Sequence, residues 1–505
     1  MNTAIRTACP DGYDVIAITA EAIRTRGLPG IVIVGLGDTS VQESRERVRA
    51  AILASGRRTP RGRLVVNLAP SGTRKRGTGL DLSIALALLG LDEPIARECP
   101  APLVIGELGL DGSIRAAEGL PGLVQMALGE GRRLILPDTQ AALAARIEGL
   151  RYVSCSTLDD ALAAMQDPGR YTVGQDEPIS APMADREAAL VLAAQPVAGL
   201  AMLAMAAGGH HTLISGPSGS GKSLLASAAR WLMPPLEADE RLTHARVAHW
   251  AGLAGPEQLL SRDRPFRAPH HAITATALLG GGTHARPGEV SLAHTGVLFL
   301  DELGERPRAT LDLLREPMDS GVIPGLRPDG RTVLPAAFTL LLAGTPCPCG
   351  RWGQADGACQ CLSRHRDPVA GKLSSGLRDR LDLRVMLDSG GPEGLMHGLP
   401  QPEDLPALVR EARARQRHWS ARTGGCAWQG RMSREELDVR CPRDDAARQL
   451  EEHLRRSGAS RRTFTAIRRV ALTLANLAGR PTPDEEDLGR ATLLRQEAWP
   501  DAMLS

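Results

Sequence analysis

The sequence of 505 residues predicts an α/β protein made of several domains. Three observations favour this fold class. Residues 1–166 alternate short apolar runs with amphipathic segments, a glycine-rich loop follows an apolar run near residue 216, and the pattern from Pro402 onward is helical throughout. A chain of this length is sufficient for about two to four domains with cores of their own.

The N-terminal region, residues 1–166, begins with two expected strand–helix pairs. Residues 31–34 are apolar and predict a strand that ends in a glycine turn, and residues 39–55 place apolar side chains at helical spacing. Residues 64–68 predict a second strand and residues 80–91 a second helix. This alternation is the reason for expecting a first α/β-type domain here.

The remaining boundaries follow from turns and composition. Asp111-Gly112 is typical of a two-residue hairpin turn. Residues 167–185 contain Asp-Pro-Gly and further prolines, which predict a linker. A second α/β domain is expected over residues 186–395, and a helical C-terminal domain over residues 402–505.

The most specific motif is a phosphate-binding loop of the form GxxxxGK[ST]. Its members are Gly216, Pro217, Ser218, Gly219, Ser220, Gly221, Lys222 and Ser223. Glycines allow backbone N–H groups to surround phosphate oxygens, and the following helix adds its positive N-terminal end. Lys222 is expected to reach the β- and γ-phosphates and Ser223 to ligate Mg²⁺. The loop therefore predicts binding of ATP with Mg²⁺.

An acidic strand supplies the second half of the predicted ATP site. Residues 297–300 are apolar and lead into Asp301 and Glu302, about 80 residues after the loop. Asp301 is expected to hold Mg²⁺ through water, and Glu302 to polarise the attacking water.

Composition limits the remaining choices. Hydrophobic residues make up 43% and charged residues 23%, as in globular proteins, and the formal net charge of +2 gives no overall electrostatic signature for nucleic acid. Residues 188–209 are apolar but contain Pro196, which favours a pair of packed helices over a membrane span. The N-terminus lacks the pattern of a signal peptide, so we expect a cytoplasmic protein.

The segment between the phosphate loop and the acidic strand carries the motifs of a known family. They are RPFRAPHH at 264–271, three glycines at 280–282 and RPGEVSLAH at 286–294. In this order they resemble the magnesium-chelatase-like AAA+ ATPases, specifically the ComM/YifB branch. Further matching motifs lie at residues 34–36, 43–51, 66–70, 106–108 and 111–112. The resemblance covers nearly the whole chain.

The resemblance implies a fold and a function. Residues 1–166 would adopt a Lon-protease-like (ribosomal S5 domain 2-like) α+β fold, residues 186–395 an AAA+ domain, and residues 402–505 an α-helical lid of the magnesium-chelatase C-terminal type. Family members form ATP-driven hexameric rings. The family's namesake is a DNA helicase that promotes branch migration during natural transformation, so the expected partners are single-stranded and branched DNA and further copies of the chain. No serine stands at the nucleophile position of Lon proteases, so peptidase activity is not expected.

The resemblance also implies catalytic residues outside the loop. Thr345 occupies the sensor-1 position, where the family usually has Asn. A hydroxyl reaches less far than an amide and offers one donor, which leaves open a slow or inactive family member. Arg462 matches the sensor-2 position on the lid, although the adjacent Arg461 leaves the assignment open by one residue.

Arg380 matches the region of the family's arginine finger, which reaches the γ-phosphate bound by a neighbouring subunit. The alternative is a surface arginine paired with Asp379 or Asp382.

Four cysteines lie close together at 347–361. Cys347, Cys349, Cys359 and Cys361 form a CxC-x9-CxC set, and four thiolates at this spacing suit a structural, tetrahedral Zn²⁺ site. The alternative is a set of reduced free thiols in a surface insertion.

Candidate DNA contacts come from two segments that lie near the ring pore in the family. His270 and His271 are in the first, with structural hydrogen bonding as the alternative. Arg327 and Arg331 are in the second, a hairpin expected over 321–332, with ordinary solvation as the alternative. The arginines of the C-terminal region are interspersed with acids, so they predict a solvated helix face.

Two classes of function remain open from the sequence. The first is an ATP-dependent DNA helicase acting in homologous strand exchange. The second is an AAA+ ring ATPase that does not act on DNA, either a chaperone-like remodeller or an accessory ATPase of the metal-chelatase type. The near-neutral charge keeps the second class open.

Overall fold

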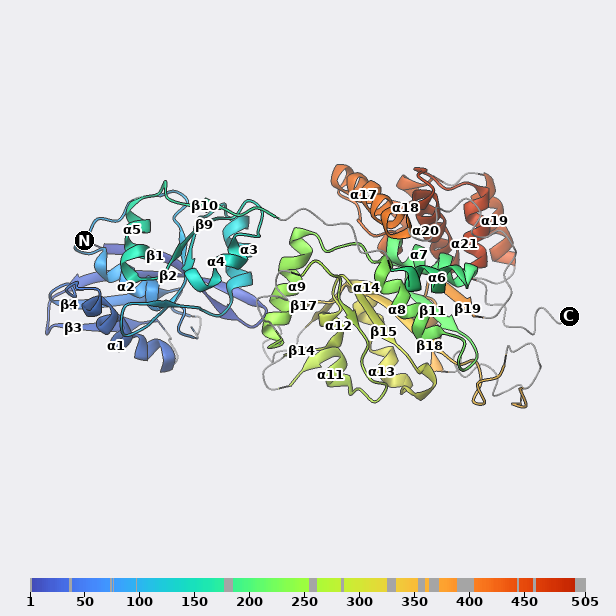
Figure 1. Cartoon of the computed structure of the whole chain (residues 1–505), viewed down its shortest axis with the longest axis horizontal. Helices are drawn as coiled ribbons and strands as arrows, with labels where there is room; N and C mark the ends of the chain where they lie inside the picture. The colour runs from blue at the N-terminus through green and yellow to red at the C-terminus, as the bar shows by residue number, and fades with distance from the viewer. Residues whose placement is uncertain are drawn as a thin grey trace. The chain divides into compact units, whose positions relative to one another are not determined.

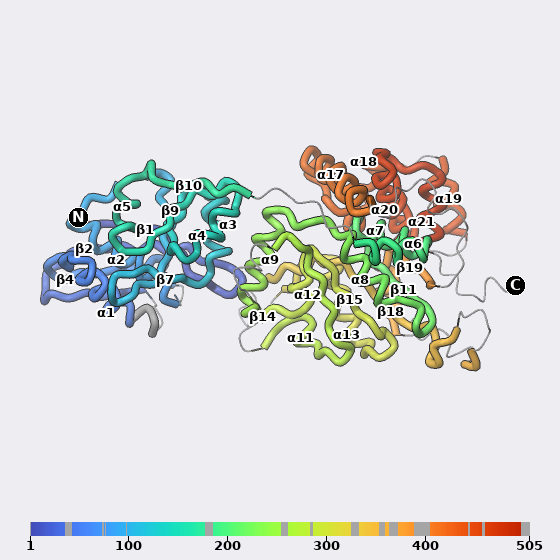
Figure 2. The backbone as a smooth tube through the Cα atoms, in the orientation of Figure 1, coloured from blue at the N-terminus to red at the C-terminus, as the bar shows by residue number. Residues whose placement is uncertain are grey.

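A computed structural model gives the fold of the chain (Figures 1 and 2). It describes residues 2–35, 39–72, 75, 77–96, 98–176, 185–253, 261–282, 286–324, 333–352, 359–362, 372–387, 404–442, 445–456 and 460–495. The chain divides into two compact units. Unit 1 comprises Met1–Ile179 and Glu237–Ser261, and unit 2 comprises Ser180–Leu236 and Arg262–Ser505.

Unit 1 is built on an eight-stranded mixed sheet of order β10-β9-β8-β5-β1-β2-β4-β3. Its strands are β1 (Asn2–Asp11), β2 (Asp14–Thr25), β3 (Gly30–Val34), β4 (Arg63–Ala69), β5 (Leu103–Val104), β8 (Leu134–Pro137), β9 (Arg151–Cys155) and β10 (Thr172–Val173). Strands β1 and β2 form an antiparallel pair, whereas β3 and β4 are parallel. The helices are α1 (Thr39–Ala54), α2 (Asp81–Leu89), α3 (Leu120–Gly129), α4 (Ala141–Ala144) and α5 (Leu158–Gln166). The assignment to the Lon-like fold stays a prediction.

Several local predictions for this unit are confirmed. The expected strands at 31–34 and 64–68 lie within β3 and β4, and the expected helix at 80–91 contains α2, whose residues are all buried. The dipeptide Asp111-Gly112 does lie between two antiparallel strands, β6 (Glu107–Leu108) and β7 (Ile114–Arg115), but residues 109–113 connect them, so the turn is longer than the two-residue turn expected. Gly112 has a φ of 83°, a conformation that favours glycine.

One helix from the expected ATPase segment belongs to unit 1. It is α9 (Ala238–Trp250). Arg246 lies 3.9 Å from the ring centroid of Tyr13 and 2.7 Å from an Asp14 carboxylate oxygen. The ring of His249 accepts a hydrogen bond from the backbone of Gly119 at 3.1 Å. These contacts attach α9 to unit 1, so the structure divides the chain here differently from the boundaries expected from sequence.

Unit 2 contains a five-stranded parallel sheet of order β12-β15-β18-β11-β19. The strands are β11 (Thr212–Ser215), β12 (Phe266–Arg267), β15 (Val297–Leu300), β18 (Thr339–Gly344) and β19 (Leu383–Met386). All five carboxyl ends therefore lie at one edge of the sheet, the edge where ligands bind in open α/β proteins. This multidomain α/β architecture, with its helical C-terminal part, agrees with the predicted fold class.

The helices of unit 2 share one core with this sheet. They include α6 (Arg186–Ala193), α7 (Pro196–Gly208), α8 (Lys222–Leu232), α17 (Leu405–Thr423), α19 (Asp445–Arg456), α20 (Arg461–Leu477) and α21 (Glu485–Leu493), whereas α18 (Arg434–Arg440) packs in a smaller cluster with Leu472 of α20. Buried residues from α7, β11, α17 and α20 belong to a single apolar cluster. The apolar stretch at 188–209 forms α6 and α7, which separate at Pro196 as expected. Among the described residues, no helix is long and apolar enough to cross a membrane.

A buried polar chain links the lid to the sheet. His210, just before β11, lies 2.9 Å from a carboxylate oxygen of Asp382 through Nδ1 and 2.7 Å from the hydroxyl of Thr473 on α20 through Nε2. All three residues are buried. A buried polar group that loses its partner costs more than the bond itself contributes. These two hydrogen bonds of His210 therefore fix where α20 lies against the sheet.

We expect Thr473→Val to lower the free energy of unfolding by about 1–3 kcal/mol, because it leaves a buried ring nitrogen without its partner. The control is Thr492→Val, since the Thr492 hydroxyl bonds to the carbonyl of Leu488 in its own helix. We expect that change to stay within about 0.5 kcal/mol. Urea titration followed by tryptophan fluorescence measures both. Equal effects of the two variants would contradict a specific role for His210.

Candidate active site

The phosphate loop connects β11 to α8 at the carboxyl edge of the unit 2 sheet. Gly219 and Gly221 have φ values of 79° and 88°, which the tight loop requires and which side chains disfavour. The Lys222 ammonium is buried inside the loop and donates to the carbonyl oxygens of Gly216 at 2.9 Å and Pro217 at 2.6 Å. The loop thus holds a positive charge at the N-terminal end of a helix, where an anion binds best.

The acidic strand β15 and the strand that precedes the phosphate loop, β11, end at the same edge of the sheet. β18 separates β15 from β11, and Asp301 and Glu302 follow β15 directly. The hydroxyl of Ser223 donates to a carboxylate oxygen of Asp301 at 2.5 Å. The structure therefore brings together the two residues predicted to hold Mg²⁺, and their oxygen ligands are the kind that this ion prefers.

Glu302 has an unusual backbone conformation for a residue other than glycine. Its φ is 53°, in the left-handed region. Its N–H donates to a carboxylate oxygen of Asp301 at 2.8 Å. Its side chain is 60% exposed, so the carboxylate is accessible to water. Strained backbone of this kind is concentrated at functional sites because it aims a side chain.

The Glu302 carboxylate is paired with a candidate DNA-contact residue. Nδ1 of His271 lies 2.7 Å from Glu302 Oε2, and the ring of His271 lies against that of His270 at 4.0 Å. Arg306 holds this arrangement, because it donates to the carbonyl oxygens of Asp301 at 2.9 Å and Pro269 at 2.8 Å. Burial lowers the pKa of Arg306 from its ordinary value. The sequence did not indicate the pairing of His271 with Glu302.

We expect His271→Ala to raise ATP hydrolysis without DNA by on the order of 5-fold, because a hydrogen bond that occupies the carboxylate is worth about 1 kcal/mol. His270→Ala is the matched control, since the ring of His270 accepts a hydrogen bond from the backbone N–H of Ala272 and not from the Glu302 side. A phosphate-release assay without DNA measures both variants. An unchanged or lower rate in His271→Ala would show that the contact does not restrain Glu302.

Thr345 and the cysteines follow β18. Thr345 is half-buried and comes directly after the strand that lies between the acidic strand and β11. Its role as sensor 1 stays a prediction.

The four cysteine sulfurs lie within 4.8 Å of one another. Three of the separations are 3.3, 3.7 and 3.8 Å, near the spacing of about 3.8 Å that follows from tetrahedral Zn–S bonds of about 2.3 Å. The cluster is therefore compatible with zinc.

The thiol of Cys349 also suits a metal. A hydrogen bond from the backbone of Arg351 lowers the pKa of Cys349 to about 6. A lowered pKa favours the thiolate, which is the form that metals bind, whereas burial raises the pKa of Cys347, so this preference holds for Cys349 and not for all four cysteines.

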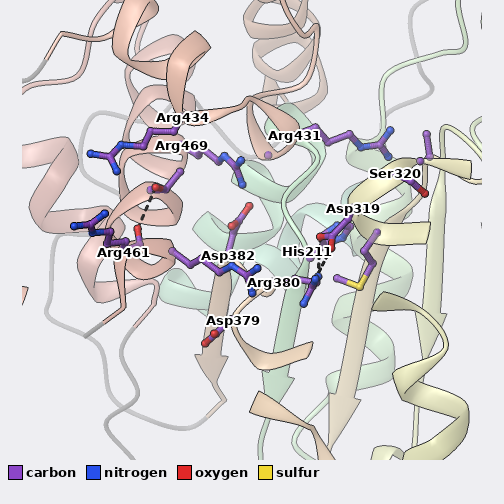
Figure 3. A pocket seen from close by; sticks show the side chains of 16 residues that line it. His211, Asp319, Ser320, Asp379, Arg380, Asp382, Arg431, Arg434, Arg461 and Arg469 are labelled. Atoms are coloured by element: carbon purple, nitrogen blue, oxygen red, sulfur yellow. Dashed lines mark hydrogen bonds and ion pairs between the residues drawn. The ribbon is translucent and has the colours of Figure 1, made fainter. Parts of the chain in front are cut away.

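A separate pocket of about 670 Å³ gathers arginines from the C-terminal helical part and from the turn that precedes β19 (Figure 3). The arginines that line it are Arg380, Arg431, Arg434, Arg461, Arg462 and Arg469. The predicted finger residue and both candidates for sensor 2 are therefore together in one pocket. The six arginines outnumber the three aspartates of the lining, Asp319, Asp379 and Asp382, and this excess of positive charge suits a phosphate or another anion.

Arg380 is paired in this pocket with a residue that the sequence did not suggest. It forms a two-pronged ion pair with Asp319, and one of the two bonds measures 2.7 Å. The hydrogen bond from Arg380 lowers the pKa of Asp319. The alternative partners considered from sequence were Asp379 and Asp382. The pairing with Asp319 replaces them, and it links Arg380 to the end of α14 (Arg315–Ser320).

The arginine pocket lies at the opposite edge of the sheet from the phosphate loop. His211, Ala337 and Asp382 line it, and each stands just before the amino end of its strand. The phosphate loop begins after the carboxyl end of β11. β11 joins the pocket residue His211 to the loop, and its four residues span roughly 13 Å at about 3.3 Å per residue. The pocket that contains Arg380 and Arg462 therefore lies at the other end of this strand from the loop of its own chain.

His211 is a pocket residue that sequence reasoning missed. Its Nδ1 accepts a hydrogen bond from the backbone of Leu340 at 2.9 Å, so the neutral ring carries its proton on Nε2. Burial lowers the pKa of His211 to about 3, which keeps the ring neutral at physiological pH. A histidine ahead of a strand gives no sequence signal for such a position.

The remaining DNA candidates, Arg327 and Arg331, lie outside the described residues.

Family models match three parts of the chain. Residues 20–140 match "Subunit ChlI of Mg-chelatase", residues 191–393 match "Magnesium chelatase, subunit ChlI", and residues 402–495 match "Magnesium chelatase, subunit ChlI C-terminal".

Whole proteins are similar over nearly their full length. Rv2897c of Mycobacterium tuberculosis is 36% identical, over 96% of this chain and 97% of that protein. YifB of Escherichia coli is 34% identical, over 94% and 93%. Competence protein ComM of Haemophilus influenzae is 31% identical, over 93% and 92%.

Proposed function

Because this chain belongs to the ComM/YifB family of magnesium-chelatase-like AAA+ ATPases, we propose that it is an ATP-dependent DNA helicase that forms hexameric rings. The helicase promotes branch migration during homologous recombination of incoming DNA in natural transformation. Its substrates are single-stranded and branched DNA, and it acts in the cytoplasm, where these substrates are.

The ATP chemistry is assigned to residues at the carboxyl edge of the sheet. The N–H groups of the loop and the Lys222 ammonium bind the phosphates, and Ser223 and Asp301 hold Mg²⁺. The ion supplies charge neutralisation on the phosphate oxygens. Glu302 orients the attacking water and accepts its proton. Thr345 contacts the γ-phosphate or the water from the neighbouring strand.

A second copy of the chain completes this site. The arginine pocket lies at the far edge of its own sheet, which supports a role for Arg380 and Arg462 on the nucleotide of a neighbouring subunit. Repeated pairing of the loop edge with the pocket edge is a heterologous contact, and such contacts form a ring when the rotation between neighbouring subunits closes. This supports the oligomeric part of the proposal.

The contact between His271 and Glu302 carries the proposal that DNA is the substrate. The candidate DNA-contact segment lies 2.7 Å from the carboxylate that activates water. A strand that engages His270 and His271 would change the position of Glu302, so substrate binding and hydrolysis would be linked. Arg327 and Arg331 complete the proposed DNA contacts.

A branched-DNA assay tests this function. A three-strand junction with one labelled strand should be resolved by the protein with ATP and Mg²⁺, and not by Glu302→Gln. DNA should stimulate hydrolysis, and DNA binding should weaken steeply as salt is raised. Two results together would reject the helicase function. ATP hydrolysis would be stimulated by neither single-stranded nor branched DNA, and DNA binding would not depend on salt.

The second candidate is a ring ATPase that does not act on DNA, either a chaperone-like remodeller or a metal-chelatase-type accessory ATPase. The names of the matched family models and the net charge of +2 favour it. It predicts ATP hydrolysis that responds to a protein partner and not to DNA. The junction assay separates the two candidates.

A further inference from the structure

The cysteine segment and the phosphate loop begin next to each other at the carboxyl edge of the sheet. β18 leads into the cysteine segment and β11 leads into the loop. The two strands are parallel neighbours, with Ser215 opposite Gly344. The first residues after each strand therefore start at the same level, which brings the cysteine segment close to the phosphate loop.

A direct hydrogen bond joins the two segments. The backbone N–H of Ser218 in the phosphate loop donates to the carbonyl oxygen of Gly350 at 2.8 Å. Gly350 has a φ of 71°, and a Cβ added there would lie 3.0 Å from the Cβ of Ser218. Only glycine allows this approach without a shift of the loop. Gly350 directly follows Cys349, so the cysteine turn determines where the acceptor lies.

The turn itself depends on Cys347. The N–H of Gly350 donates to the carbonyl oxygen of Cys347 at 3.0 Å, and the N–H of Trp352 donates to its sulfur at 3.3 Å. Cys347 and Trp352 are both buried. Thiols form only weak hydrogen bonds, and four thiolates at this spacing repel one another unless a cation is bound. A tetrahedral metal supplies the attraction that keeps the turn closed.

We propose that the metal bound by Cys347, Cys349, Cys359 and Cys361 braces the phosphate loop through Gly350, so that metal binding and nucleotide binding strengthen each other. This inference rests on the nucleotide binding contained in the proposed function. Coupling between two sites is reciprocal and typically changes affinity by about 5- to 150-fold. A connection through a single backbone contact belongs at the lower end of that range, on the order of 5- to 20-fold.

The test uses the full-length protein loaded with zinc and needs neither DNA nor hydrolysis. A fluorescent ADP analogue with excess Mg²⁺ is titrated before and after a zinc-selective chelator removes the metal. We expect the Kd for the analogue to rise on the order of 5- to 20-fold on metal removal. In the reciprocal measurement, saturating ADP–Mg²⁺ should slow zinc release to a colorimetric chelator by a similar factor. This second measurement uses native wild-type protein throughout, so it does not depend on how the metal-free form folds.

Two variants distinguish an effect transmitted through the contact between Gly350 and Ser218 from a general effect of changing cysteines. Gly350→Ala keeps all four thiols but presses on Ser218, so it should retain zinc and bind the ADP analogue more weakly. Cys426→Ser changes a cysteine of the same unit outside the cluster and should alter neither quantity.

Three results would overturn the inference: purified protein without zinc, equal affinity for the analogue with and without metal, or zinc release that ADP does not slow. Failure of the zinc-loaded protein to bind the analogue at all would instead reject the ATP site of the proposed function.

Discussion

Replacing Glu302 by glutamine is expected to lower kcat for ATP hydrolysis by about 10²–10⁴-fold, the usual contribution of a positioned general base. The amide keeps the size of the side chain and the left-handed backbone, but it cannot accept a proton. Lys222, Ser223 and Asp301 are unchanged, so binding of ATP with Mg²⁺ should persist. Steady-state phosphate release gives kcat, and titration with a fluorescent ATP analogue gives the affinity.

Glu305→Gln is the matched control. Glu305 is an exposed carboxylate three residues later, in the short turn after the acidic strand. The same chemical change there should leave kcat within about twofold, as for most surface substitutions. Loss of ATP binding in Glu302→Gln, or equal losses of kcat in both variants, would contradict the assignment of Glu302 as the base.

Replacing Arg380 by alanine is expected to lower kcat by about 10³–10⁵-fold, the range found for arginine fingers. The guanidinium is held by Asp319 at 2.7 Å in a pocket with other arginines, so its position is fixed before a phosphate arrives. Because this pocket lies away from the loop of its own chain, ATP affinity of the single chain should change little. The rate of phosphate release and the Kd for a fluorescent ATP analogue separate the two effects.

Arg378→Ala is the control for Arg380. Arg378 belongs to the same short helix, α16 (Ser375–Arg378), and is not among the residues that line the pocket. We expect kcat to stay within about threefold of the wild type. A large loss of activity in Arg378→Ala, with an equal loss of thermal stability in both variants, would indicate a damaged fold and not a lost finger.

The sequence predicted local features well because their signals are local. The phosphate loop and the acidic strand follow fixed patterns, and they occur between β11 and α8 and after β15, in the order expected. The apolar stretch at 188–209 formed two helices because Pro196 cannot continue the first one. The compatibility of the cysteines with zinc likewise follows from their spacing.

The features that the sequence did not indicate depend on residues that are distant in the chain. Arg246 contacts Tyr13 across 233 positions, which draws α9 into unit 1. Arg380 pairs with Asp319, 61 positions away, and not with an acidic neighbour in sequence. The opposite placement of the loop and the arginine pocket follows from the parallel sheet, which becomes apparent only once strand order is known.

The most direct test of a shared, ring-based ATP site is a subunit-mixing experiment. Lys222→Ala and Arg380→Ala chains, each inactive alone, are coexpressed and purified as mixed assemblies through different tags. If the loop of one chain works with the pocket of the next, random mixing in equal amounts restores ATP hydrolysis to about a quarter of the wild-type rate per chain, because about one interface in four then carries both intact halves. A mixture as inactive as its two components would contradict this account, because it would mean that each chain needs both residues for its own site.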